Sequence, residues 1–243
     1  MTRMDEVAED IHRISVFVPE VGLTFNQFLI ADEQSALIHT GYHAMYDDVR
    51  RAVASVLDPG RLAYVVVPHF EADECGGMAR FAAAAPGSVL VCSDIGMRVN
   101  LSHWDFSGPV QGVQDGAILE LGRHRLRFLE TPHVHHWDSM MVVEETTRSL
   151  FPADLFLQPG EQPVVVREDL GREMCAVYRA TGIFASEGPV LRAVDRIERM
   201  ALRWVHPMHG GSLSGEALPH YTEALRAGNF AYDGRLLGRR LPA

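Results

Sequence analysis

The stretch VVVPHFEADECGGM, residues 65–78, decides how the rest of the chain is interpreted. An apolar run ends at Pro68, and side chains that can bind a metal ion or a proton follow it closely. Isolated ionised groups are costly to bury unless they are paired or bind a metal. The density of such groups after a buried strand therefore predicts a metal site. The groups are His69, Glu71, Asp73, Glu74 and Cys75.

The composition is that of a globular protein, and it disfavours polyanionic partners. The chain has 243 residues, of which 47% are hydrophobic and 22% charged, enough for a sizeable core. Its formal net charge of −10 argues against binding to nucleic acid or to an anionic membrane surface. The sequence contains no lysine, which excludes Schiff-base chemistry and a P-loop lysine.

The cysteines and the N-terminal residues bear on the cellular compartment. The three cysteines are odd in number and widely spaced, so we expect no disulfide framework. The first ten residues, MTRMDEVAED, are acidic and lack the apolar segment of a signal peptide. No apolar run approaches the length of a membrane span. We therefore predict a cytoplasmic protein with no membrane partner.

Hydrophobic periodicity predicts the elements of the first half of the chain. Period-two alternation predicts antiparallel strands near the N-terminus, and spacings of three and four residues predict helices further on. Continuous apolar runs indicate strands that are buried on both faces. Strands are expected at 11–18, 24–31, 35–40, 62–67 and 89–92, and helices at 46–57, 71–85 and 93–100.

The second half is predicted to contain two hairpins, a short strand and three helices. Together the elements suggest one domain, residues 1–243, built from two βββαβαβ-like halves. Its class is α/β (α+β), with two mixed sheets face to face and helices outside, a four-layer αββα sandwich. The hairpins are expected at 117–130 and 140–152, the strand at 204–206, and the helices at 173–179, 190–202 and 215–227.

Histidine and carboxylate groups also follow three later predicted strands. They occur in TPHVHHWDSM (131–140), LFPADLF (150–156) and HPMHGG (206–211). Loops at strand ends converge on one edge of a layered α/β protein. A single histidine there is usually a hydrogen-bonded rim residue, and a single aspartate is usually a helix cap. The joint occurrence at four strand ends instead predicts one metal site.

The order HxExD, HxxDSM, an aspartate after a strand, and PxHG resembles the metallo-β-lactamase superfamily. Within it, the chain is most similar to the di-iron domain of flavodiiron proteins and their stand-alone oxygen-binding relatives. Glu71 stands where the hydrolases have the second histidine of HxHxDH, and this glutamate is the flavodiiron hallmark. Residues 24–26, TFN, resemble the TYN stretch of that family, and 135–140, HHWDSM, resemble HWPDSM. The resemblance spans residues 11–211.

The resemblance implies a ligand set for two metal ions. Where the family usually has a histidine after the aspartate, this chain has Glu74, which either ligates through an oxygen or points away and leaves a position for water. Catalytic candidates are His136 and Asp138, which, like His133, could orient ligand imidazoles or relay protons. One metal would be bound by His69, Glu71 and His135, and the other by Asp73 and His209, with Asp154 bridging both.

A carboxylate-rich ligand set favours iron and redox chemistry over zinc and hydrolysis. The resemblance therefore implies a non-haem protein with two iron ions that binds or reduces dioxygen, or nitric oxide. It would act as a sensor, or as a reductase with a separate electron-donor protein. We expect no flavodoxin domain and no flavin bound by this chain, and the family implies a homodimer.

Two alternatives remain open from the sequence. Zinc also accepts mixed histidine and carboxylate ligands, so a zinc-type metallo-hydrolase acting on a thioester, phosphoester or lactone is the second hypothesis. A third is a non-enzymatic module whose metal site has degenerated, for which Glu74 is the only support. Metal content and ester turnover distinguish the three.

Overall fold

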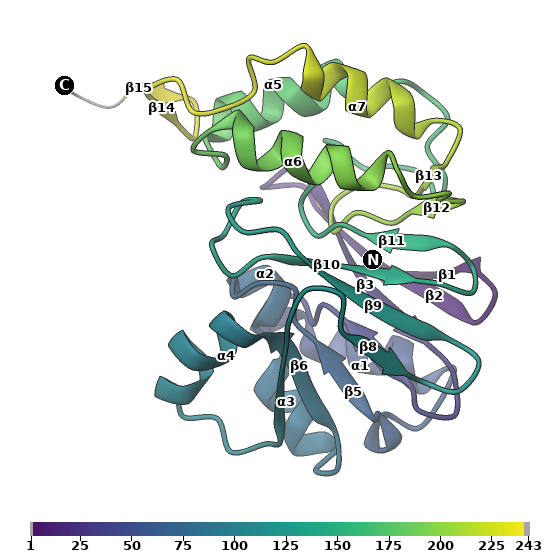
Figure 1. Ribbon diagram of the computed structural model, residues 1–243. Helices are drawn as coiled ribbons and strands as arrows, with labels where there is room; N and C mark the ends of the chain where they lie inside the picture. The colour runs from purple at the N-terminus through teal and green to yellow at the C-terminus, as the bar shows by residue number, and fades with distance from the viewer. Residues whose placement is uncertain (1, 241–243) are drawn as a thin grey trace.

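Two β-sheets pack face to face in the computed structural model, and helices cover the outer face of each sheet (Figure 1). The structure describes residues 2–240. Residue 1 and residues 241–243, which the predicted domain includes, lie outside the described residues. The arrangement confirms the predicted four-layer αββα sandwich.

The first sheet has seven strands in sequence order. Its first four strands pair antiparallel, and β4 to β7 pair parallel. The sequence did not predict β1 or β7, because these edge strands carry polar residues and show little apolar periodicity. The strands are β1 (Thr2–Ala8), β2 (Ile11–Val18), β3 (Leu23–Ile30), β4 (Ala36–Ile38), β5 (Tyr64–Val66), β6 (Val89–Ser93) and β7 (Val110–Val113).

The second sheet has six strands in the order β13-β12-β11-β10-β9-β8. Both predicted hairpins are confirmed. The prediction of two βββαβαβ-like halves is wrong for this half, because two helices follow β11 in succession and only β11 and β12 pair parallel. The strands are β8 (Ile118–Glu120), β9 (Arg125–Glu130), β10 (Met140–Glu144), β11 (Ser149–Phe151), β12 (Trp204–Val205) and β13 (Leu213–Ser214).

The helices form the two outer layers, with α5 to α7 at the top of Figure 1 and α1, α3 and α4 at the bottom. A strand pair, β14 (Arg235–Leu236) and β15 (Arg239–Arg240), follows the last helix. No helix of residues 2–240 has the length and hydropathy that a membrane crossing requires. The helices are α1 (Tyr46–Ala54), α2 (Ala72–Cys75), α3 (Met78–Ala84), α4 (Asp94–Val99), α5 (Gly171–Thr181), α6 (Glu187–Ile197) and α7 (Leu218–Arg226).

The helix predicted at 71–85 is two helices, α2 and α3, separated by Gly76 and Gly77. A Cβ atom on Gly76 would lie 2.4 Å from the carbonyl oxygen of Ala72 and 2.6 Å from the backbone nitrogen of His43. Only glycine allows α2 to approach the turn after β4 this closely. The break therefore follows from a tertiary contact, which helical periodicity does not reveal.

Alternating residues of the strands divide between the layers, as a period of two requires. Phe28, Ile38 and Val66 belong to the cluster between the two sheets. Their neighbours Leu29 and Leu37 face the cluster under α1 and α3 instead. A third cluster lies between the second sheet and the helices α5, α6 and α7. The three clusters fix the positions of the strands, and therefore of the sheet edge at which the loops meet.

Candidate metal centre

Loops from both sheets meet at one edge of the sandwich and are tied together by backbone hydrogen bonds. The backbone N–H of Met140 donates to the carbonyl oxygen of Pro68 at 3.0 Å, which joins the 131–139 loop to the loop after β5. The N–H of Asn26 donates to the carbonyl oxygen of Met208 at 2.8 Å. The N–H of Met208 donates to the carbonyl oxygen of Ala153 at 2.8 Å, and His135 contacts Asp154, so the four ligand-bearing stretches predicted from the sequence are neighbours in space.

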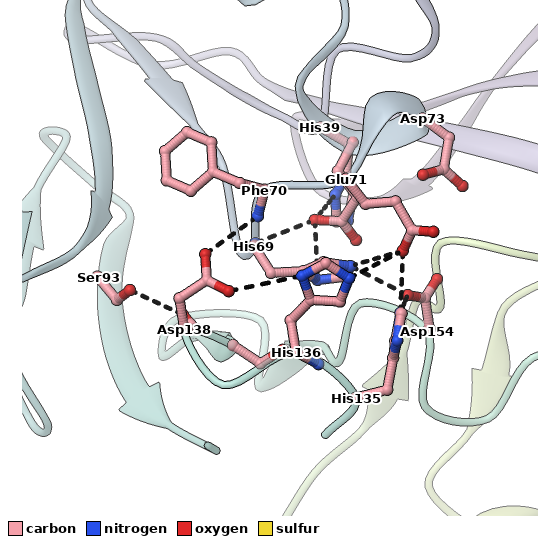
Figure 2. A network of polar contacts seen from close by, with 12 residues as sticks. His39, His69, Phe70, Glu71, Asp73, Ser93, His135, His136, Asp138 and Asp154 are labelled. Atoms are coloured by element: carbon pink, nitrogen blue, oxygen red, sulfur yellow. Dashed lines mark hydrogen bonds and ion pairs between the residues drawn. The ribbon is translucent and has the colours of Figure 1, made fainter. Parts of the chain in front are cut away.

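Four of the predicted ligands lie in one compact group, drawn in Figure 2. The Nε2 atom of His135 is 2.8 Å from Oδ2 of Asp154 and 3.0 Å from Oε2 of Glu71. The Nε2 atom of His69 is 3.3 Å from each of the same two oxygens. Donor atoms bound to one ion at about 2.0–2.2 Å lie roughly 3–3.5 Å apart. These four side chains therefore have the spacing of a mixed nitrogen and oxygen site.

A further predicted ligand, His209, contacts the other oxygen of Asp154, and Asp73 contacts His209. The Nε2 atom of His209 is 3.1 Å from Oδ1 of Asp154 and 3.4 Å from Oδ2 of Asp73. Asp154 thus directs Oδ2 toward one pair of histidines and Oδ1 toward a third histidine. This is the arrangement that a carboxylate shared by two metal ions requires.

The loop that carries His209 is held by residues of the first sheet. The side-chain amide of Asn26 donates to the carbonyl oxygens of Pro207, at 2.9 Å, and Gly210, at 2.8 Å. The buried guanidinium of Arg13 donates to Asn26 and to the same Gly210 oxygen. The Nδ1–H of His209 donates to the carbonyl oxygen of Thr24 at 3.1 Å, which leaves Nε2 facing the acids. The TFN stretch therefore positions a predicted ligand.

The donor set fits a pair of metal ions. Oδ1 of Asp73 and Oδ1 of Asp154 are buried and accept no hydrogen bond among the described residues, although Nε2 of His209 lies 3.1 Å from the Asp154 oxygen. Burial lowers the pKa of His135, but its contacts with Asp154 and Glu71 outweigh this and raise it to about 9. The same balance, with Asp154 and Asp73, raises the pKa of His209 to about 10. The buried carboxylates thus attract positive charge strongly, and a metal ion satisfies that demand better than protons do.

Glu74 lies on a different side of His69. Its side chain is fully buried, and its Oε2 atom is 3.4 Å from Nδ1 of His69 and 3.3 Å from Nδ1 of His39. Glu74, His69 and Asp154 also offer donor atoms that lie within 4.8 Å of one another. Glu74 is therefore close to the cluster, although its nearest neighbours are nitrogen atoms of His39 and His69.

Of the two catalytic candidates, His136 lies within the cluster, where it offers a donor atom within 4.8 Å of those of His69, Glu71 and His135, and Asp138 lies beside it (Figure 2). The Nε2 atom of His136 is 3.7 Å from Oε2 of Glu71, and its Nδ1 atom is 3.6 Å from Oδ1 of Asp138. Asp138 is buried and accepts the backbone N–H of Phe70 at 3.2 Å. His136 is partly exposed, and the Glu71 side chain is 43% exposed, so both side chains reach the solvent. His133 is exposed, and no contact among the described residues brings its side chain to the cluster.

Two residues near the cluster were missed in the sequence. His39 is fully buried beside Glu74 and has a φ of 61°. Tyr42 lies close enough to the acids that burial and the charges of Asp73, Glu71 and Asp154 raise its pKa. The signal was present for His39, since it too is a polar residue directly after an apolar strand.

The family model described as ODP family beta lactamase matches residues 23–210. The chain belongs to this family. The resemblance to the metallo-β-lactamase superfamily, and within it to flavodiiron di-iron domains, is thereby confirmed. The matched span includes all of the predicted ligands, from His69 to His209.

Named relatives of this family are longer than this chain. The nitric oxide reductase of Moorella thermoacetica is 28% identical over 198 residues, which are 78% of this chain and 49% of the relative. The rubredoxin-oxygen oxidoreductase of Megalodesulfovibrio gigas is 31% identical over 139 residues, 57% of this chain and 35% of the relative. The solved structure of rubredoxin oxygen:oxidoreductase from Desulfovibrio gigas superposes with a TM-score of 0.81 at 25% identity, covering 92% of this chain and 62% of that one. The chain thus spans about half the length of the first relative.

Proposed function

We propose that the chain is a non-haem di-iron protein that binds or reduces dioxygen or nitric oxide. The observation that carries the proposal is Glu71, whose carboxylate lies 3.0 Å from Nε2 of His135 where a hydrolase would have an imidazole. The names of the two relatives, a nitric oxide reductase and a rubredoxin-oxygen oxidoreductase, support it. Iron is favoured over zinc because carboxylates stabilise its higher oxidation state.

Each ligand is assigned to one of the two ions according to the oxygen of Asp154 on whose side it lies. When bound, two iron ions would supply electrons to the diatomic gas. Zinc ions could not, because zinc has no redox chemistry. His136 would move protons between the solvent and the cluster, since it is partly exposed and reaches Glu71 at one end and Asp138 at the other. One ion would be held by His69, Glu71, His135 and Asp154, and the other by Asp73, His209 and Asp154.

The partners and the setting of the protein are part of the proposal. The relative named rubredoxin-oxygen oxidoreductase supports a separate electron-donor protein for this chain as well. A sensor that turns over slowly would use the same ligands without a fast donor. A homodimer, a single domain without bound flavin and a cytoplasmic location are predictions that accompany this proposal.

The test combines metal analysis with gas consumption. Protein produced with ample iron should contain about two irons per chain, and the chemically reduced protein should consume dioxygen or nitric oxide. Glu71→Gln should lose iron and gas consumption, whereas the exposed control Glu20→Gln should retain both. Full occupancy by zinc, together with turnover of a thioester, phosphoester or lactone, would establish the hydrolase instead.

A further inference from the structure

We propose that Glu74 is not a metal ligand. It is a positioning residue that contacts Nδ1 of His69 and so fixes the orientation of that ring, and His39 is its partner. The inference rests on the proposed metal centre. It explains the residue that most clearly departs from the family's ligand pattern, and it assigns a role to His39.

The two nitrogens of His69 have different neighbours. Its Nε2 atom faces the oxygens of Glu71 and Asp154, both at 3.3 Å. Its Nδ1 atom faces Oε2 of Glu74 at 3.4 Å, and its backbone N–H donates to the same oxygen at 3.3 Å. Since the two nitrogens point away from each other across the ring, a carboxylate on Nδ1 directs Nε2 toward the cluster.

A related arrangement is found at His209, with a backbone group in place of Glu74 and a hydrogen bond in place of the longer 3.4 Å contact between Nδ1 of His69 and Glu74. There Nδ1 donates to the carbonyl oxygen of Thr24 at 3.1 Å, and Nε2 faces Asp73 and Asp154. Metal-binding histidines commonly donate their second N–H to a carboxylate or a carbonyl oxygen, which fixes the tautomer and the ring orientation. Glu74 thus occupies, for His69, the place that the Thr24 carbonyl occupies for His209.

His39 supplies the second contact of the Glu74 carboxylate. Both side chains are completely buried, and Nδ1 of His39 is 3.3 Å from Oε2 of Glu74. A buried carboxylate needs a partner that offsets its lost hydration. In Figure 2, His39 lies above the His69 ring, whereas His135 lies below it and Asp154 to its right.

The backbone around the pair is built to keep Glu74 in place. The carbonyl oxygen of Glu74 accepts the N–H of Thr40 at 2.7 Å and its hydroxyl at 2.9 Å. A Cβ atom on Gly77 would lie 2.9 Å from the carbonyl oxygen of Thr40, so the link between α2 and α3 packs closely against this turn. His39 itself has a φ of 61°, a conformation that non-glycine residues adopt rarely and that marks a constrained position.

If Glu74 does not ligate, the two ions are held unequally. The ion near His69 has four protein side chains, while the ion near Asp73 has only Asp73, His209 and the shared Asp154. The second ion should therefore bind more weakly and retain more open positions, which a small diatomic ligand or water can fill.

Anaerobic titration with Co²⁺ separates the two roles. Wild-type protein should bind two Co²⁺ in a tight step and a weaker step. Glu74→Gln should still bind two, with the tight step weakened by about 10- to 100-fold. Asp73→Asn, the control that removes a ligand of the second ion, should lose the weaker step. His39→Gln should weaken the same step as Glu74→Gln, and the double variant should be no worse than the worse single one.

Each other outcome overturns a defined statement. Loss of the weaker step in Glu74→Gln, as in Asp73→Asn, would show that Glu74 is a ligand of the second ion. Unchanged Co²⁺ binding by His39→Gln would show that Glu74 acts without His39. Wild-type protein that binds no Co²⁺ would overturn the metal centre, and this role with it. If Glu74→Gln does not fold, ¹⁵N NMR of the zinc-loaded wild-type protein decides. His69 should show a protonated Nδ1 and a metal-bound Nε2, and the reverse would contradict the inference.

Discussion

Tyr178 donates its hydroxyl hydrogen to the carbonyl oxygen of Asp154 at 2.8 Å. The same hydroxyl oxygen accepts the backbone N–H of Leu157 at 3.0 Å, so one buried side chain on α5 closes the loop that carries the shared carboxylate. Tyr178, on a helix of the outer layer, thereby helps to position Asp154 at the sheet edge. The conformation of this loop therefore depends on how α5 packs.

Replacement of Tyr178 by phenylalanine should destabilise the protein by about 1–3 kcal/mol, because a buried N–H and a buried carbonyl lose their partner. Urea unfolding monitored by circular dichroism measures the change. Tyr232→Phe is the matched control, since Tyr232 is 41% exposed and its loss should change little. Equal stability of Tyr178→Phe and wild type would show that the loop does not depend on this hydroxyl.

Replacement of Asp154 by asparagine should remove both metal ions, because the two oxygens of Asp154 serve the two halves of the centre. We expect the iron content to fall from about two per chain to well below one. Asp48→Asn, on the exposed face of α1, should leave the iron content unchanged. Retention of one tightly bound iron in Asp154→Asn would show that the two ions do not share this carboxylate.

The contact between His124 and Glu144, at 3.1 Å, predicts a pH-dependent contribution to stability away from the metal centre. Burial raises the pKa of Glu144, but contacts with His124 and Thr147 outweigh this and lower it to about 2. A carboxyl group with a lowered pKa stabilises the fold above its unfolded pKa of about 4.3 and loses that contribution as the pH falls through its folded value.

Wild type should therefore exceed Glu144→Gln in unfolding free energy at pH 7, and the difference should shrink between about pH 5 and pH 2. Urea titrations of the metal-free proteins at several pH values measure it. Glu145→Gln is the neighbouring control, because Glu145 makes contacts only with partly exposed arginines among the described residues. A difference independent of pH would show that the charge of Glu144 contributes nothing.

The close approach at Gly76 predicts that replacement by alanine destabilises the protein at Gly76 but not at Gly87. Gly76→Ala should cost about 1–3 kcal/mol in unfolding free energy, since the new methyl group would overlap backbone atoms. Gly87→Ala should be nearly neutral, because nothing lies within 4 Å of a Cβ built there. Thermal unfolding of both variants checks the prediction, and equal melting temperatures would contradict it.

The ligand positions were predictable because strand ends converge, and sequence marks a strand end by where its apolar run stops. His69, Asp154 and His209 each follow such a run, and the structure brings them together. The edge strands β1 and β7 were missed because exposed edges need no apolar face. Neither their polarity nor their length distinguishes them from loops.

The role of Glu74 could not be predicted, because its partner His39 lies on another segment. Periodicity describes each segment alone, whereas the contact depends on how α2 packs against the turn after β4. The helix break at Gly76 was missed for the same reason. Tertiary contacts that form between segments, and not residue types, decide these details.

Asp154 follows β11 of the second sheet and His69 follows β5 of the first, so bound iron would join side chains from the two sheets. An ion that binds only the folded form raises its stability in proportion to the logarithm of the free ion concentration. Iron supply would then determine the lifetime of the folded protein as well as its activity. Under iron starvation, the unfilled molecules would be the first to unfold and be degraded.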